Sequence, residues 1–143
     1  MCSVTHVAVG ALIGGLVNSN LAAFGLGLVS HLPLDAIPHF DFKDYRIDAA
    51  ISVAMLAGLL LAAGVSPVLL GALGAAAPDF ENLLWKMGII NERRKVFPTH
   101  SGLIRHGRAL TGSVPAEIAV SAFSVAAAVL AVMLRGMLGG GVS

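Results

Sequence analysis

The chain alternates long apolar stretches with short polar ones, and this pattern predicts its helices. Three stretches contain no Asp, Glu, Lys or Arg, at 1–34, 49–78 and 118–134. Uncharged apolar stretches of about 18 residues or more are typical of helices that span a bilayer. The first two are longer than one span, and turn-forming residues interrupt them at 17–20 and 64–67. Each therefore predicts a helical hairpin.

We expect an all-α fold with five helices in one membrane-embedded domain over 1–143. The architecture would be a polytopic bundle of two hairpins, a polar segment and a last transmembrane helix. The helices are expected near 4–17, 21–36, 48–64, 67–80 and 114–137. The first four would be about 21–26 Å long, which is shorter than the hydrocarbon core of about 30 Å. They would thin the bilayer locally, extend at their ends or be buried in the protein, and an unusually apolar soluble bundle is the alternative.

The composition supports the membrane interpretation and excludes several other classes. Charged residues make up 12% of the chain, and hydrophobic residues 57%, whereas soluble domains carry about 25% charged residues. A net charge of +1 provides no basic surface for nucleic acid. The single cysteine, Cys2, excludes a disulfide framework. The N-terminus lacks the basic start of a signal peptide and carries His6 early, so we expect the first apolar segment to be retained.

Small residues recur at helical spacing, which predicts close helix packing. Gly10 and Gly14 form one pair on the first predicted helix. A second series, on the third predicted helix, is Ala50, Ala54, Gly58 and Ala62. In lipid such stripes let two helix backbones approach closely. The same patterns are compatible with a homo-oligomer.

The basic residues predict the orientation of the chain in a membrane. If both hairpins cross and return, the N-terminus, the 37–47 loop and the 81–113 segment lie on one side. That side holds eight of the nine basic residues, and Arg135 lies on the other. By the positive-inside rule, the side that holds these eight basic residues is expected to be cytoplasmic. All five histidines fall at the same face, together with several acids.

The most informative motif runs from Ser30 to His39. His31 and Asp35 are four residues apart, so a helix places both on one face. His39 follows after Pro38, which we expect to end the helix. Imidazole together with carboxylate suits zinc, non-haem iron or manganese. The alternative is a hydrogen bond between His31 and Asp35 that only caps the helix.

Other candidate ligands lie in separate parts of the chain. They are His6, Asp79, His100 and His106. Glu81 is a candidate ligand or general base, and a solvated helix boundary is the alternative for Asp79. A shift of 44 residues superposes Asp35 on Asp79 and hints at a duplicated hairpin. The chain from Leu103 onward can also be helical, with His106 on that helix.

These motifs resemble the membrane-bound metal-dependent hydrolase family typified by YdjM, with the motifs in a different order. The resemblance covers roughly residues 5–106 and rests on His6, Ser30–Asp35, Pro78–Asp79 and Thr99–Ser101. It implies a small helical protein of the bacterial cytoplasmic (inner) membrane with a His/Asp metal site and hydrolase activity. The ligands implied are His6, His31, Asp35, Asp79 and His100.

Our leading hypothesis is a metal-dependent hydrolase that acts on a lipid or phosphoester at the cytoplasmic face. It would bind one or two divalent ions, zinc first, with manganese or iron as alternatives. Glu81 or Asp41 would accept a proton from water, and Arg105 or Arg108 would neutralise developing charge. Membrane lipids are the expected partners, and no nucleic acid is expected. A non-catalytic metal-binding or metal-transport protein is the alternative, although apolar helix centres disfavour transport.

Overall fold

The computed structural model describes residues 2–108 and 114–139, and side chains up to Met133. Over this part of the chain it contains five α-helices, a short 3₁₀ helix and no β-strand, which confirms the predicted all-α class. The elements are α1 (Ser3–Leu16), α2 (Asn20–Ala36), α3 (Tyr45–Ala63), α4 (Pro67–Lys86), η1 (Glu92–Arg94) and α5 (Val114–Gly139).

Both predicted hairpin turns are present, and local residue types explain them. Ser19 caps α2 and Ser66 caps α4, each by accepting a hydrogen bond from the backbone N–H three residues ahead. Pro67 starts α4, a position where its missing N–H costs nothing. Gly64 ends α3 with a φ of 60°, a backbone conformation that side chains with a Cβ rarely adopt. Each apolar stretch therefore folds back on itself at the predicted place.

Two predicted helix boundaries are wrong. Helix α3 begins at Tyr45 rather than near 48, because the Asp44 carboxylate accepts a hydrogen bond from the backbone N–H of Arg46 and caps the helix there. Helix α4 continues to Lys86 rather than ending near 80. The polar motif that begins at Pro78 therefore lies inside α4. Its side chains do not end the helix. Asp79 lies near His31, and Glu81 accepts a hydrogen bond from the backbone N–H of Val96.

The segment after Leu103 is also not helical over the described residues to Arg108. Gly102 turns the chain with a φ of 83°, and the segment then runs back along the end of α2. There the backbone N–H of Gly107 donates to the carbonyl oxygen of Asp35 at 2.7 Å. Tertiary pairing has replaced the helix that local sequence predicts.

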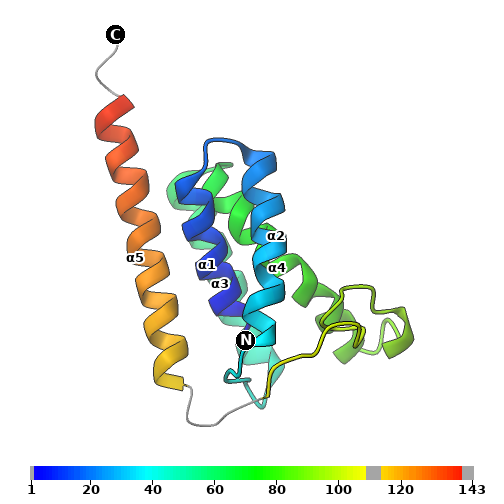
Figure 1. Cartoon of the computed structure of the whole chain (residues 1–143). Coiled ribbons are helices and arrows are strands. Elements are labelled where there is room, and N and C mark those ends of the chain that lie inside the picture. The colour runs from blue at the N-terminus through cyan, green and yellow to red at the C-terminus, as the bar shows by residue number, and fades with distance from the viewer. Residues whose placement is uncertain (1, 109–113, 140–143) are drawn as a thin grey trace.

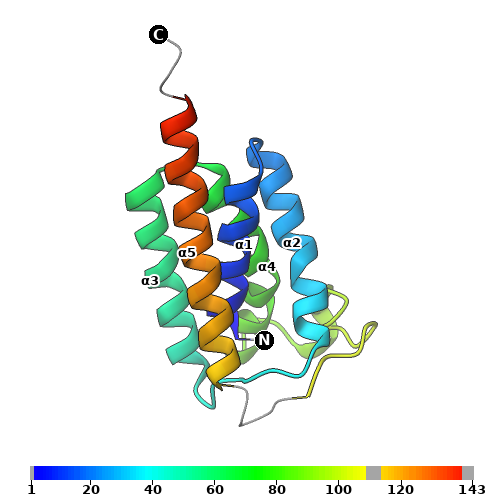
Figure 2. The same ribbon diagram turned by 60° about the vertical axis from the view of Figure 1, so that its left-hand side comes forward.

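Helix α4 packs against both α1 and α2, and α1 also packs against α5 (Figures 1 and 2). Glycines make these crossings close. A Cβ on Gly71 would overlap the carbonyl oxygen of Gly10, and one on Gly27 would overlap that of Gly71. The predicted packing role of Gly10 and Gly14 is confirmed, because a Cβ on Gly14 would meet the backbone of Pro67.

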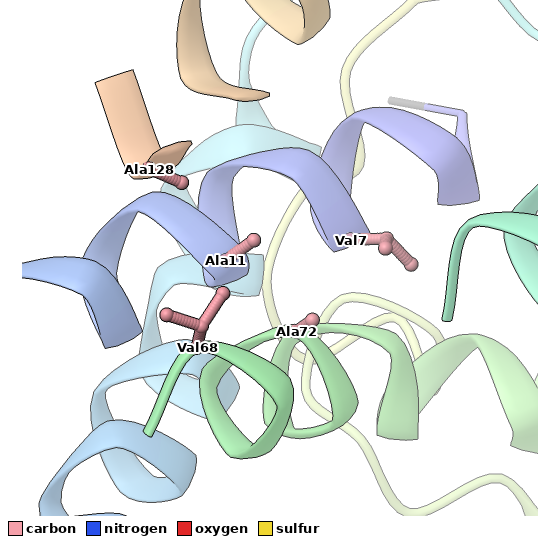
Figure 3. Close-up of a cluster of buried hydrophobic side chains, with 5 residues drawn as sticks. All are labelled: Val7, Ala11, Val68, Ala72 and Ala128. Atoms are coloured by element: carbon pink, nitrogen blue, oxygen red, sulfur yellow. The ribbon is translucent and has the colours of Figure 1, made fainter. Parts of the chain in front are cut away.

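The apolar core lies where α1, α4 and α5 meet (Figure 3). Its buried residues are Val7, Ala11, Val68, Ala72 and Ala128. The small-residue series on α3 is different: Ala54 and Gly58 are exposed, and a Cβ on Gly58 would have no neighbour within 4 Å. The packing prediction for this series is therefore wrong within one chain, because none of the described residues lies against Gly58.

Two helices in the described part of the chain are long and apolar enough to cross a membrane. They are α3, with 19 residues, and the Val114–Met133 part of α5, with 20 residues. Helix α1 is apolar but has only 14 residues. Leu61 on α3 and Phe123 on α5 are 88% and 69% exposed, as expected for helices that face lipid. By length and composition alone, two such helices are weak evidence for membrane association.

Candidate metal site

Polar side chains from separate segments converge at one end of the bundle. The start of α1, the end of α2 and the 37–44 loop lie there, together with the last turns of α4 and the 95–108 segment (Figure 1). The sequence prediction that all five histidines gather at one face is thus confirmed. Asp35, which is 1% exposed, lies at the centre of the cluster.

Four imidazoles surround the Asp35 carboxylate. His6 forms a hydrogen bond with it, with Nε2 at 3.1 Å from Oδ1. His31 Nε2 and His100 Nε2 lie 3.1 and 3.2 Å from Oδ2. His106 Nδ1 lies 3.5 Å from the same oxygen. Three segments, α1, α2 and the 95–108 segment, thus supply nitrogen atoms to one buried carboxylate.

Several of these nitrogens are close to Asp35 without being hydrogen-bonded. His31 Nε2 and His100 Nε2 are buried and have no hydrogen-bond partner. Two ligand atoms on a tetrahedral zinc ion, each about 2.0–2.1 Å from it, lie about 3.3 Å apart. The observed separations from Asp35 Oδ2 match that spacing. The set His31, Asp35 and His100 therefore has the donor types and the separations of a metal site.

Outer contacts orient this set. His31 Nδ1 lies 2.7 Å from the carbonyl oxygen of Ala75, so Nδ1–H donates there and Nε2 keeps its lone pair for an ion. The hydroxyl of Thr99 donates to Asp35 Oδ2 at 2.8 Å. The sequence analysis named Thr99 only as part of the Thr99–Ser101 motif, and it gave no sign that the Ala75 carbonyl contacts the site. The signal for Thr99 was its position next to His100.

Asp79 lies at the edge of the same site. Its Oδ1 is 3.8 Å from His31 Nε2, and its Oδ2 is buried without a partner. His6, His31 and Asp79 form a second set with metal-ligand spacing. Because His31 has only one free nitrogen, this set and the Asp35 set would share one ion. His6 stacks on His31, with ring centroids 3.8 Å apart.

A third set lies beside the first and comprises His39, Asp41 and His106. His39 Nδ1 lies 2.7 Å from the carbonyl oxygen of Ile37, and Nε2 lies 3.3 Å from Asp41 Oδ1. Burial opposes the charged form of His39, but the Asp41 carboxylate outweighs it and raises the pKa of His39. Burial likewise opposes the charged form of Asp41, and His39 outweighs it and lowers the pKa of that carboxyl. This third set could hold a second metal ion.

The remaining predicted residues lie around the cluster. Glu81 accepts hydrogen bonds from the backbone N–H groups of Val96 and Phe97, and its Oε1 is 3.7 Å from His100 Nδ1. It thus holds the segment that carries His100, and its role as a base stays a prediction. Arg105 and Arg108 are exposed next to His106. The backbone carbonyl of Arg108 accepts a hydrogen bond from the backbone N–H of His39 at 3.2 Å, so the chain at Arg108 is held against the cluster by its backbone.

Two carboxylates outside the ligand sets, one buried and one half-buried, hold the start of α1 in place. Glu117, on α5, accepts hydrogen bonds from Cys2 Sγ and Thr5 Oγ1. Asp48, on α3, accepts from the first two backbone N–H groups of α1, where a negative charge is favoured. Both residues therefore position His6. In the sequence, Glu117 stands only as the charged residue directly before the charge-free stretch 118–134.

Comparisons with known proteins found no match for this chain. No protein-family model matches it, and neither a curated protein nor a solved structure does. The resemblance to YdjM-like hydrolases therefore stays a prediction. What the described residues show is an all-helical chain with buried His/Asp clusters that could hold a metal ion.

Proposed function

We propose that this protein is a membrane-embedded, metal-dependent hydrolase of a lipid or other phosphoester. The observation that carries the proposal is the set of buried imidazole nitrogens that lie at ligand spacing from Asp35 without hydrogen bonds. Such atoms cost free energy when they are buried without a partner. A divalent ion, with zinc as the first candidate, would satisfy them.

The donor set is consistent with one or two ions. His31, Asp35 and His100 would hold the first, with Asp79 in reach. His39, Asp41 and His106 would hold the second, and Asp35 lies between the two places. A bound divalent ion lowers the pKa of coordinated water to about 7 and so supplies hydroxide at neutral pH.

The chain's own residues would complete the chemistry. With one ion bound, Asp41, which is 47% exposed, would accept a proton at the open edge of the site. With a second ion held by Asp41, Glu81 is the candidate proton acceptor. Arg105 and Arg108 lie on the exposed segment beside His106 and would orient a phosphate by paired hydrogen bonds.

The membrane arrangement is also part of the proposal. Helices α3 and α5 would cross the bilayer, and α1, α2 and α4 would complete a polytopic bundle in a cytoplasmic (inner) membrane. The site would face the cytoplasm, because the basic residues that flank the helices gather at that end. A tag inserted next to Gly88, in an exposed turn, should be accessible only from the cytoplasm. Access from the outside alone would reverse the orientation.

Elemental analysis of the purified, zinc-loaded protein tests the site. We expect bound metal in the wild type and in Glu92→Ala, an exposed acid outside the cluster. We expect loss of metal in His31→Ala and Asp35→Ala. A wild type without metal, or equal metal in all four proteins, would contradict the site. Retained metal with no metal-dependent hydrolysis across a panel of lipid phosphoesters would favour a non-catalytic metal-binding protein.

A further inference from the structure

A cavity lies beside the candidate metal site, between α2, α3 and α4. Helices α2 and α3 barely touch each other, although α3 and, more extensively, α2 pack against α4. The space between them has a volume of about 660 Å³. This is within the range of about 300–1,000 Å³ that is typical of small-molecule sites.

The cavity has one polar end and one apolar end. Asp35, Asp79 and His106 line the polar end, so it opens directly onto the candidate metal site. Leu56 on α3 and Leu73 on α4 are among the residues that line the apolar part. A ligand that filled the cavity would therefore have a polar head near the metal ligands and an apolar body between the helices.

Charge at the polar end restricts the head group. The acids Asp35, Asp41, Asp48 and Asp79 line it, whereas Lys86 is the basic residue there. Carboxylates repel a phosphate unless cations neutralise them, and divalent ions at the candidate site would do so. The head group that suits the metal-loaded site is thus a phosphate.

The apolar part also restricts how a ligand enters. Val53 on α3 and Ala77 on α4 line the cavity and are exposed, so the cavity is open along its side. If α3 crosses a membrane, this opening faces the acyl chains of the bilayer. An apolar chain can then slide in laterally without passing through water.

We infer that the cavity between α2, α3 and α4 binds the hydrocarbon chain of an amphiphilic phosphate ester and holds its phosphate at the Asp35 site. The inference rests on the proposed function and narrows its substrate to a lipid-like phosphoester with a chain in the protein. Each buried methylene strengthens binding by about fourfold. A long chain should therefore bind far more tightly than the phosphate head alone.

The test uses a dodecylphosphonate that carries a photoreactive diazirine at the end of its chain, with the full-length protein in nanodiscs. We expect cross-links to the parts of α3 and α4 that include Val53 and Leu73, mapped by mass spectrometry. Ala77→Phe places a large ring in the cavity and should reduce these cross-links by about tenfold or more. Ala57→Phe, an equal change at an exposed position outside the cavity, should leave them unchanged.

Two labelling results would overturn the inference. One is labelling spread evenly over α3 and α5 in every variant, and the other is equal labelling in Ala77→Phe and Ala57→Phe. Val53→Trp fills the cavity from the opposite wall and repeats the test if Ala77→Phe fails to fold. Methylphosphonate, without a chain, should compete poorly with the probe, and equally strong competition would count against a bound chain.

The cross-linking readout is independent of hydrolysis and of zinc uptake. Cavity labelling that Ala77→Phe abolishes, in a protein that takes up no zinc, would support the chain-binding cavity and reject the proposed metal-dependent activity. Metal-dependent hydrolysis of short and long phosphoesters at equal rates, without cavity labelling, would support the metal-dependent activity and reject the chain-binding cavity.

Discussion

Helices α1 and α3 start at the same end of the molecule and carry small residues at the same spacing, but they have opposite surroundings. The stripe on α1 is buried, because Gly10 and Gly14 meet the backbone of α4. On α3 the positions offset by 44 residues are Ala54 and Gly58, and both are exposed. Small residues form a packed face only where a second backbone with small residues lies opposite, as Gly71 does for α1.

The closely packed helices and the exposed helices also differ in what they contribute to the candidate metal site. Helices α1, α2 and α4 are closely packed and carry His6, His31, Asp35 and Asp79. Helices α3 and α5 are more exposed and carry none of the candidate ligands. Their contribution is indirect, through Asp48 and Glu117, which hold the start of α1. The comparison predicts which substitutions matter most.

The largest effect is expected for Gly71→Leu. The new side chain would overlap the backbone of α1 at Gly10, so the two helices would have to separate. We expect a loss of about 3 kcal/mol or more in the free energy of unfolding, measured by denaturation in detergent. Gly58→Leu on α3 should not destabilise the protein, because a Cβ there meets no neighbour within 4 Å and leucine is the better helix former. Equal losses in both variants would contradict the contrast between the helices.

Glu117→Ala should have the next largest effect. It leaves Cys2, Thr5 and the backbone N–H of Phe40 without their acceptor near the start of α1. Hydrogen bonds to a charged group contribute about 1.5–3 kcal/mol, so we expect a loss of about 2 kcal/mol in the same measurement. Glu92→Ala is the control, because Glu92 is exposed. A stability equal to that of this control would show that α5 does not hold α1.

Thr99→Val tests the outer contacts of the site rather than the packing. The variant keeps the shape of the side chain and removes the hydroxyl that donates to Asp35. Such contacts to a metal ligand typically change metal affinity by about 10–100-fold. Zinc titration with a competing chelator measures this, with Ser101→Ala as control because that hydroxyl contacts only the exposed carbonyl of Pro98. Unchanged affinity in Thr99→Val would argue against Asp35 as a ligand.

The smallest effect is expected for Asp48→Ala, which removes the cap of α1. Burial, with smaller contributions from Glu117 and Asp48, raises the pKa of the Cys2 thiol to about 12. The thiol is therefore protonated at neutral pH and should react slowly with iodoacetamide. Loss of the cap costs about 1 kcal/mol, which predicts alkylation about fivefold faster. Asp44→Ala, which removes the cap of α3 instead, should leave the Cys2 rate unchanged.

Much of the fold was predictable because its signals are local. Charge-free stretches and turn-forming residues act within a few residues, and they predicted five helices and both hairpins. The end of α4 was missed because Pro78 and Asp79 are typical of a helix end. Tertiary contacts keep the helix intact through Lys86 and turn those polar residues toward the site.

The site was predictable in composition but not in geometry. The i,i+4 spacing of His31 and Asp35 places them on one face of any helix, and the shared membrane side predicted that His100 lies near. No local signal could assign the Thr99 hydroxyl or the Ala75 carbonyl to this site, because both contacts join residues far apart in the chain.

The sequence by itself therefore determined the all-α class, the two hairpins and the identity of the candidate ligands, since helix period, turn chemistry and charge distribution are properties of neighbouring residues. Only the tertiary structure decided which small-residue stripe is buried, how the segment after Gly102 runs and which nitrogens are left for an ion. These depend on which backbones meet. Backbones meet where glycines such as Gly10 and Gly71 face each other across two helices.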